Sequence, residues 1–125
     1  MQYAILCYDD EKTIEAWSQA REDEVIGKHR AFAHQLAQKG KLGPVLRLLP
    51  TTAATTVRSG DQTVVFDGPF AETKEQLLGL WIVDADSGEE ALEIARVFAG
   101  HKNTGSLEVR PLREMVSLAS LAKVA

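Results

Sequence analysis

His29 is the residue in this sequence best suited to acid–base chemistry, because it lies on the apolar side of a helical pattern. At about 100° per residue it falls between Val25, Phe32 and Leu36. An imidazole with an ordinary pKa of about 6.5 exchanges protons near neutral pH, so a His29 that faces the core is a candidate general base. A core histidine bonded to a backbone carbonyl is the alternative. Convergence of His29 with a carboxylate in a pocket would favour catalysis.

A second polar segment begins at Asp67, which is the candidate partner of His29. Asp67 precedes Gly68 and a proline, so its carboxylate either accepts backbone N–H groups in a turn or takes part in catalysis. Glu72, Thr73 and Lys74 lie between this turn and an apolar run, where loops on rigid scaffolds often carry binding groups. Lys74 would hold an anionic ligand as a point charge. A solvated loop is the alternative for these three residues.

Arg110 is a further candidate for ligand binding, together with Arg58 and Arg113. A guanidinium group can hold a carboxylate or phosphate through two parallel hydrogen bonds. The alternation of charges in this region is also typical of a solvated sheet face. The remaining histidines, His34 and His101, are expected at the surface and just after a helix, respectively. The three histidines lack metal-ligand spacing, so we expect no metal. The sequence has no glycine-rich phosphate loop, and we expect no cofactor.

The elements that position these residues follow from the hydrophobic pattern. Strands are expected at residues 3–8, 42–49 (interrupted by a glycine and a proline), 52–58, 63–66, 77–83 and 107–112. Helices are expected at residues 13–21 and 22–39, and from a cap at Ser87 to Gly100. Residues 117–125 are helical by propensity but too short to be stable alone.

This order of elements is an α+β arrangement of the ferredoxin-like, split βαβ kind with an inserted β-hairpin. Two helices on one face of an antiparallel sheet leave the other face open. A large apolar patch is unfavourable on a monomer, so we expect a second copy of the chain to cover that face. The sequence therefore predicts a homodimer.

Composition limits the class of protein. The 125 residues (13.7 kDa) suffice for one domain, and the net charge of −4 argues against a general nucleic-acid binder. The single cysteine, Cys7, excludes an intramolecular disulfide and a multi-cysteine metal site. No apolar run is long enough to span a membrane, and no basic segment follows Met1 as in a secretory signal. We expect a cytoplasmic protein.

The run DGPFAETKE at residues 67–75 is the most specific string in the chain and resembles the signature of the YCII-related proteins, also called the DGPF-domain family. Further matches are the tyrosine-rich segment at residues 3–9, TTVR at 55–58 and GSLEVRP at 105–111. The resemblance covers residues 1–116 and leaves 117–125 as a tail. It implies a ferredoxin-like fold in which two subunits form a dimeric α/β barrel. One departure is LGL at residues 78–80, where members commonly carry two glycines and an aromatic residue.

The resemblance implies no single activity, and two hypotheses follow. In the first, the protein is a small-molecule enzyme of the hydrolase or lyase type, with a cleft at the dimer interface. His29 is then the acid–base group, Asp67 orients it, and Lys74 or Arg110 binds the substrate. In the second, the protein is a non-catalytic module that senses a ligand or binds a protein such as a sigma factor. The segment at residues 67–74 then only builds the fold and the dimer.

Overall fold

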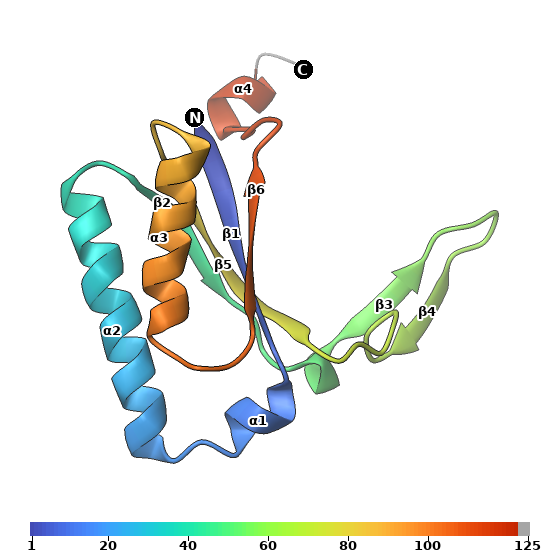
Figure 1. The fold of residues 1–125 in the computed structure, drawn as a ribbon. Helices are drawn as coiled ribbons and strands as arrows, with labels where there is room; N and C mark the ends of the chain where they lie inside the picture. The colour runs from blue at the N-terminus through green and yellow to red at the C-terminus, as the bar shows by residue number, and fades with distance from the viewer. Residues whose placement is uncertain (123–125) are drawn as a thin grey trace.

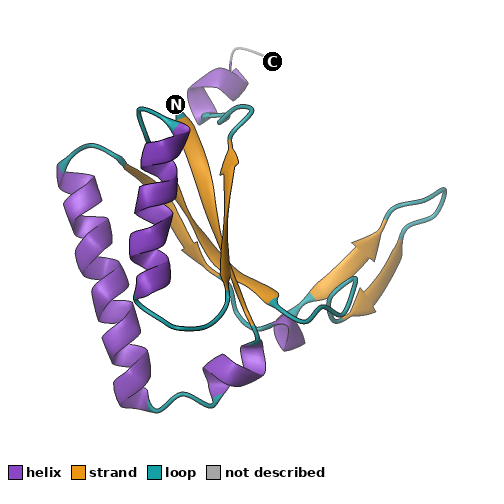
Figure 2. Cartoon of the chain, viewed as in Figure 1, coloured by secondary structure: helices purple, strands orange, loops and turns teal. Residues whose placement is uncertain are grey.

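The computed structural model describes residues 1–122 and shows an α+β protein with two antiparallel sheets (Figures 1 and 2). The four-stranded sheet has the order β2-β5-β1-β6, and a separate hairpin pairs β3 with β4. The strands are β1 (Gln2–Asp9), β2 (Leu42–Arg47), β3 (Thr55–Arg58), β4 (Val64–Asp67), β5 (Gln76–Asp84) and β6 (Ser106–Pro111). The helices are α1 (Glu11–Glu15), α2 (Gln19–Gln38), α3 (Gly88–Gly100) and α4 (Leu118–Ala122).

The core lies between one face of the large sheet and the two long helices, α2 and α3 (Figure 1). Successive side chains of a strand point to opposite faces, so alternate residues of β1 meet the helices. Ile5 pairs with Trp81 of β5 on one side and with Val109 of β6 on the other. Ile5 is fully buried, as are Val83 of β5 and Phe98 of α3. Residues of β1 in the even positions face the side of the sheet opposite α2 and α3.

The expected boundary between the first two helices is wrong. The chain breaks between Glu15 and Gln19, rather than after Arg21, because Ser18 adopts an extended conformation and caps α2. Its hydroxyl accepts a hydrogen bond from the Arg21 backbone N–H at 3.1 Å. Ser87 caps α3 as predicted, accepting from the Glu90 N–H, and α3 ends at Gly100.

The strand expected at residues 52–58 is shorter than predicted. Thr51–Ala53 form a 3-10 turn, and β3 begins only at Thr55. The Glu11 carboxylate accepts hydrogen bonds from both the backbone N–H and the hydroxyl of Thr51, at 2.7 Å each, and so holds the turn against α1. The expected irregularity in β2 is confirmed, because its register with β5 shifts between Leu42 and Val45. Part of the C-terminal tail forms α4, while residues 123–125 lie outside the described residues.

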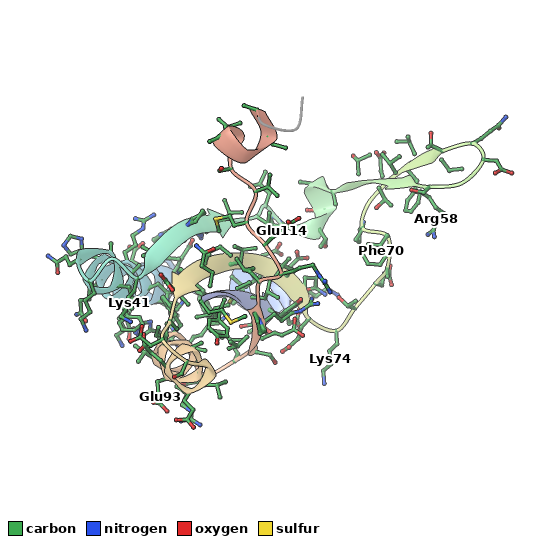
Figure 3. The ribbon with its side chains drawn as sticks, turned by 90° about the horizontal axis from the view of Figure 1, so that it is seen from above. Lys41, Arg58, Phe70, Lys74, Glu93 and Glu114 are labelled. Atoms are coloured by element: carbon green, nitrogen blue, oxygen red, sulfur yellow. The ribbon has the colours of Figure 1, made fainter. Side chains whose placement is uncertain are left out.

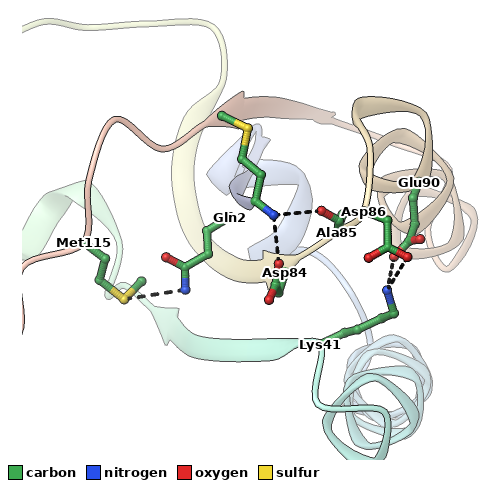
Figure 4. Close-up of polar contacts among 8 residues, drawn as sticks. Gln2, Lys41, Asp84, Ala85, Asp86, Glu90 and Met115 are labelled. Carbon is green, nitrogen blue, oxygen red and sulfur yellow. Dashed lines mark hydrogen bonds and ion pairs between the residues drawn. The ribbon is translucent and has the colours of Figure 1, made fainter.

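Polar contacts fix one end of the large sheet (Figure 4). The amino group of Met1 donates to a carboxylate oxygen of Asp84 and to the Ala85 carbonyl, at 3.1 Å each. Lys41, which joins α2 to β2, forms ion pairs with Asp86 and Glu90 at the start of α3. Both helices are thereby tied to the sheet at the end opposite α1.

The β3–β4 hairpin, with the turn that joins its strands, projects from the body of the protein; we call residues 55–67 the hairpin arm (Figure 1). Within the described part of the chain, its two strands pair only with each other. Val57 and Val65 are 62% and 63% exposed, and Phe70 just beyond the arm is 76% exposed. The arm thus presents apolar side chains to solvent. Within residues 1–122, no helix combines the length and apolar character needed to cross a bilayer.

Candidate functional site

A cavity of about 400 Å³ lies on the helix side of the large sheet, where α1, α2, β2 and β5 meet. Its wall is mainly apolar, and both tryptophans of the chain line it. Among the apolar residues that line the cavity are Ile14, Trp17, Val25, Ile26, Ala33, Leu78 and Trp81. The buried or half-buried polar groups are Cys7, Glu11, His29 and Lys102, whereas Glu15, Glu22, Arg30 and Arg47 are exposed. A mainly apolar cavity with a few polar groups is typical of small-molecule sites.

His29 reaches this cavity from α2 and is half-buried among aromatic rings. Its ring lies edge-on to Trp81 and Phe98, with centroids 5.1 and 5.5 Å away. Trp81 and Phe98 themselves stack at 4.0 Å. His29 Nδ1 lies 2.7 Å from Nδ1 of His101, the residue that caps the end of α3. The prediction that His29 lies in the apolar arc is confirmed, but its partner is another imidazole and not a backbone carbonyl.

Burial, which is the largest cause, and the neighbouring positive charges of His101, Lys102 and Arg47 together lower the pKa of His29 from its ordinary value of 6.5 to about 4. Burial also lowers the pKa of His101, with a smaller effect from Lys28. His29 is therefore a neutral imidazole at pH 7. A neutral ring offers one hydrogen-bond donor and one acceptor, and it cannot serve as the resting general acid.

A buried ion pair lies beside the cavity. Lys102 Nζ is 3.0 Å from Asp9 Oδ2, and each side chain is only 3% exposed. The Thr104 hydroxyl donates to the same oxygen at 2.8 Å, and the Asp10 N–H donates to the other. Gly105 permits this network, because at a φ of +80° a Cβ would lie 2.8 Å from the Asp9 carboxylate.

Cys7 lies next to this ion pair and also lines the cavity. Burial raises the pKa of its thiol, and this effect outweighs the opposing influence of Lys102. The thiol is therefore protonated at neutral pH and is not an activated nucleophile.

The structure does not bring Asp67 to His29 within one chain. Asp67 ends β4 on the hairpin arm, while His29 lies on α2, in the body of the protein (Figure 1). The Asp67 carboxylate makes no hydrogen bond or ion pair with any residue from 1 to 122, so it does not cap its own turn either. The catalytic role of Asp67 stays a prediction.

The residues predicted to bind a ligand also lie away from the cavity. Glu72, Thr73 and Lys74 are exposed in the loop before β5, and Figure 3 shows Lys74 directed away from the body. The Thr73 hydroxyl donates to the Glu75 carbonyl, which is a contact within the loop itself. Arg110 pairs with Ala4 in the register of β6 with β1, which places it on the face of the sheet opposite the helices.

Sequence reasoning missed Asp9, Lys102 and the pairing of His29 with His101. The signal for Asp9 was present, because it continues the alternation of Tyr3, Ile5 and Cys7 on the buried face of β1. A buried carboxylate requires a compensating charge. Among residues 1–122, no three His, Cys, Asp or Glu side chains are grouped so that they could hold a metal ion.

The chain is similar in sequence to known proteins. The family model described as the YCII-related domain matches residues 1–116, which include both sheets and stop before α4. An uncharacterised protein from Rhizobium meliloti (strain 1021) is 52% identical over 114 residues. That alignment covers 90% of this chain and 92% of the relative.

Proposed function

This chain belongs to the YCII-related domain family, and from that premise we propose that it is a protein that binds a small, mainly apolar organic molecule in the cavity beside His29. The observation that carries the proposal is the cavity itself. An apolar cavity of about 150 Å³ is known to hold one benzene ring. At about 400 Å³, this cavity has room for a bicyclic aromatic molecule.

The neutral state of His29 supports binding in preference to acid–base catalysis by a His29–Asp67 pair. A general base works best with a pKa near the working pH, and burial moves His29 well below that range. Asp67 lies on the hairpin arm and does not reach His29 of the same chain. A hydrolase or lyase built on this pair would need the arm of a second subunit to deliver Asp67.

The two tryptophans provide a direct test of binding. Both line the cavity, so their indole N–H signals in a ¹H–¹⁵N spectrum report its occupancy. We expect 2-naphthol to shift both signals. The variant Ala33→Phe fills the cavity from α2 and should weaken binding by about tenfold or more, since it removes room that the ring occupies.

Ala37→Phe is the matched control, because Ala37 lies one turn further along α2, is exposed and does not line the cavity. Binding of 2-naphthol should be unchanged in this variant. Unshifted indole signals at saturating 2-naphthol, or equal weakening by both substitutions, would contradict the proposed function.

A homodimer of ferredoxin-like subunits is the proposed assembly. Its support is the strand order β2-β5-β1-β6, with α2 and α3 on one face and the inserted hairpin between β2 and β5. The uncovered face carries Leu6, Leu46 and Leu80, which are adjacent in the strand register. Leu46 is 52% exposed. Apolar residues on this face and on the hairpin arm fit a homodimer interface, which is more apolar than an ordinary protein surface. Nothing in residues 1–122 favours a sigma factor over a second copy as the partner.

A further inference from the structure

We propose that the cavity selects uncharged aromatic ligands that carry one hydrogen-bonding group, such as an alcohol or a carboxamide, over the corresponding carboxylates. This inference rests on the proposed function, because it concerns the occupant of the same cavity. It is carried by the way in which the buried polar groups of the wall already pair with one another.

The buried cation of the cavity wall already has its counter-ion. Lys102 is 3.0 Å from the Asp9 carboxylate, and solvent reaches neither side chain appreciably. A ligand carboxylate placed beside Lys102 would bring a second negative charge to a single buried positive charge. The ligand carboxylate would lose its hydration without full compensation from the protein, which disfavours its binding. The protonated thiol of Cys7 adds no positive charge.

His29 supplies the hydrogen bond that an uncharged ligand needs. Its Nδ1 is engaged by His101, and its Nε2 has no hydrogen-bond partner within residues 1–122. Among the described residues that are at least partly buried, every side-chain nitrogen or oxygen sealed from solvent has a hydrogen-bond partner. Because Nε2 of His29 has no partner in this part of the chain, it must be accessible to solvent. Because His29 lines the cavity, Nε2 is the ring atom left for a ligand.

The contact between His29 and His101 lets Nε2 of His29 act as either a hydrogen-bond acceptor or a hydrogen-bond donor. Two neutral imidazoles joined through their Nδ1 atoms share one proton between those atoms. With the proton on His29, the Nε2 of His29 accepts a hydrogen bond from a ligand hydroxyl. With the proton on His101, the Nε2 of His29 carries a hydrogen and donates to a ligand carbonyl. An alcohol and an amide are both satisfied without a net charge.

The exposed charges at the cavity do not offset this selection. Arg47 is 4.0 Å from Glu22, and both side chains are about half exposed. Arg30 and Glu15 are exposed charges of opposite sign. Water and salt weaken the attraction of such groups for an anion.

The test compares 2-naphthamide with 2-naphthoate, which share a ring system and differ in charge at pH 7.5. Isothermal titration should give a dissociation constant for 2-naphthamide at least about tenfold below that for 2-naphthoate. Both tryptophan indole signals should shift with the amide. Equal affinities, or tighter binding of the carboxylate, overturn the selection while leaving the proposed function intact. Unshifted indole signals with both probes, and with 2-naphthol, overturn the proposed function as well.

Two variants assign the preference to His29. His29→Leu should lower the affinity for 2-naphthamide by about tenfold, since it removes the hydrogen-bond partner of the amide. His34→Leu is the matched control on the same helix, because His34 is exposed and does not line the cavity. An unchanged affinity for the amide in His29→Leu overturns the role of Nε2. The comparison of the two probes on the unaltered protein does not depend on how either variant folds.

Discussion

Replacement of Lys102 by methionine should destabilise the protein strongly, because it leaves the Asp9 carboxylate buried without a counter-ion. Asp9 would keep two hydrogen bonds of 2.8 Å, from the Thr104 hydroxyl and the Asp10 N–H. Breaking a buried ion pair by removing one partner costs about 3–5 kcal/mol. The two hydrogen bonds that remain place the expected loss near the lower end, at about 3 kcal/mol.

Urea unfolding at pH 7.5, followed by circular dichroism, measures this loss. The double variant Asp9→Asn/Lys102→Met removes both charges and keeps a polar group beside Thr104. It should therefore recover about half or more of the stability that Lys102→Met alone removes. A single variant within about 1 kcal/mol of the unaltered protein, or a double variant as unstable as the single one, would refute the reasoning.

Three further expectations concern other parts of the molecule. Burial and, to a smaller extent, nearby positive charges lower the pKa of His29 from 6.5 to about 4, so the unfolded chain takes up a proton at this residue before the folded protein does. The associated stability, about 2 kcal/mol after allowance for partial exposure, is complete above pH 6.5 and is lost as the pH falls through 4. Urea unfolding at a series of pH values gives the free energy of unfolding of the unaltered protein and of His29→Leu. The difference between the two free energies should fall between pH 6.5 and 4, and a difference that does not change with pH would contradict the prediction. Gly68→Val should cost about 1–3 kcal/mol, because Gly68 has a φ of +98° that a β-branched residue adopts poorly; an unchanged urea midpoint would count against this. Light scattering at micromolar concentration should give about twice the chain mass of 13.7 kDa, and a stable monomer would remove the argument for a homodimer.

The elements with strong local signals could be predicted from the sequence. The apolar alternation of β1, the run that forms β5 and the serine cap of α3 each have a cause within a few neighbouring residues. The start of α2 does not follow from helix propensity, because Ser18 and the residues after it all have acceptable propensities. The position of the Ser18 cap sets where α2 begins. The short turn at Thr51 depends on Glu11, which is 40 positions earlier in the chain.

The candidate site was harder to predict, because some of its contacts join residues that lie far apart in the sequence. The helical pattern placed His29 correctly on the buried side of α2, and this required only local spacing. The identity of its partner depends on where α3 ends relative to α2, and His29 and His101 are 72 positions apart. The turn at Asp67 makes it a conspicuous candidate partner in the sequence, yet the hairpin that carries Asp67 projects from the body of the protein.

The central position of β1 has a consequence for how the chain folds during synthesis. β1 pairs with β5 and β6, which begin at Gln76 and Ser106, and Asp9 meets Lys102, which lies 93 positions later in the chain. Until those segments leave the ribosome, β1 exposes an apolar strand with two unpaired edges, and such edges promote aggregation. The large sheet can therefore close only after β6 has been made, so folding should be slow relative to that of a helical protein of similar size.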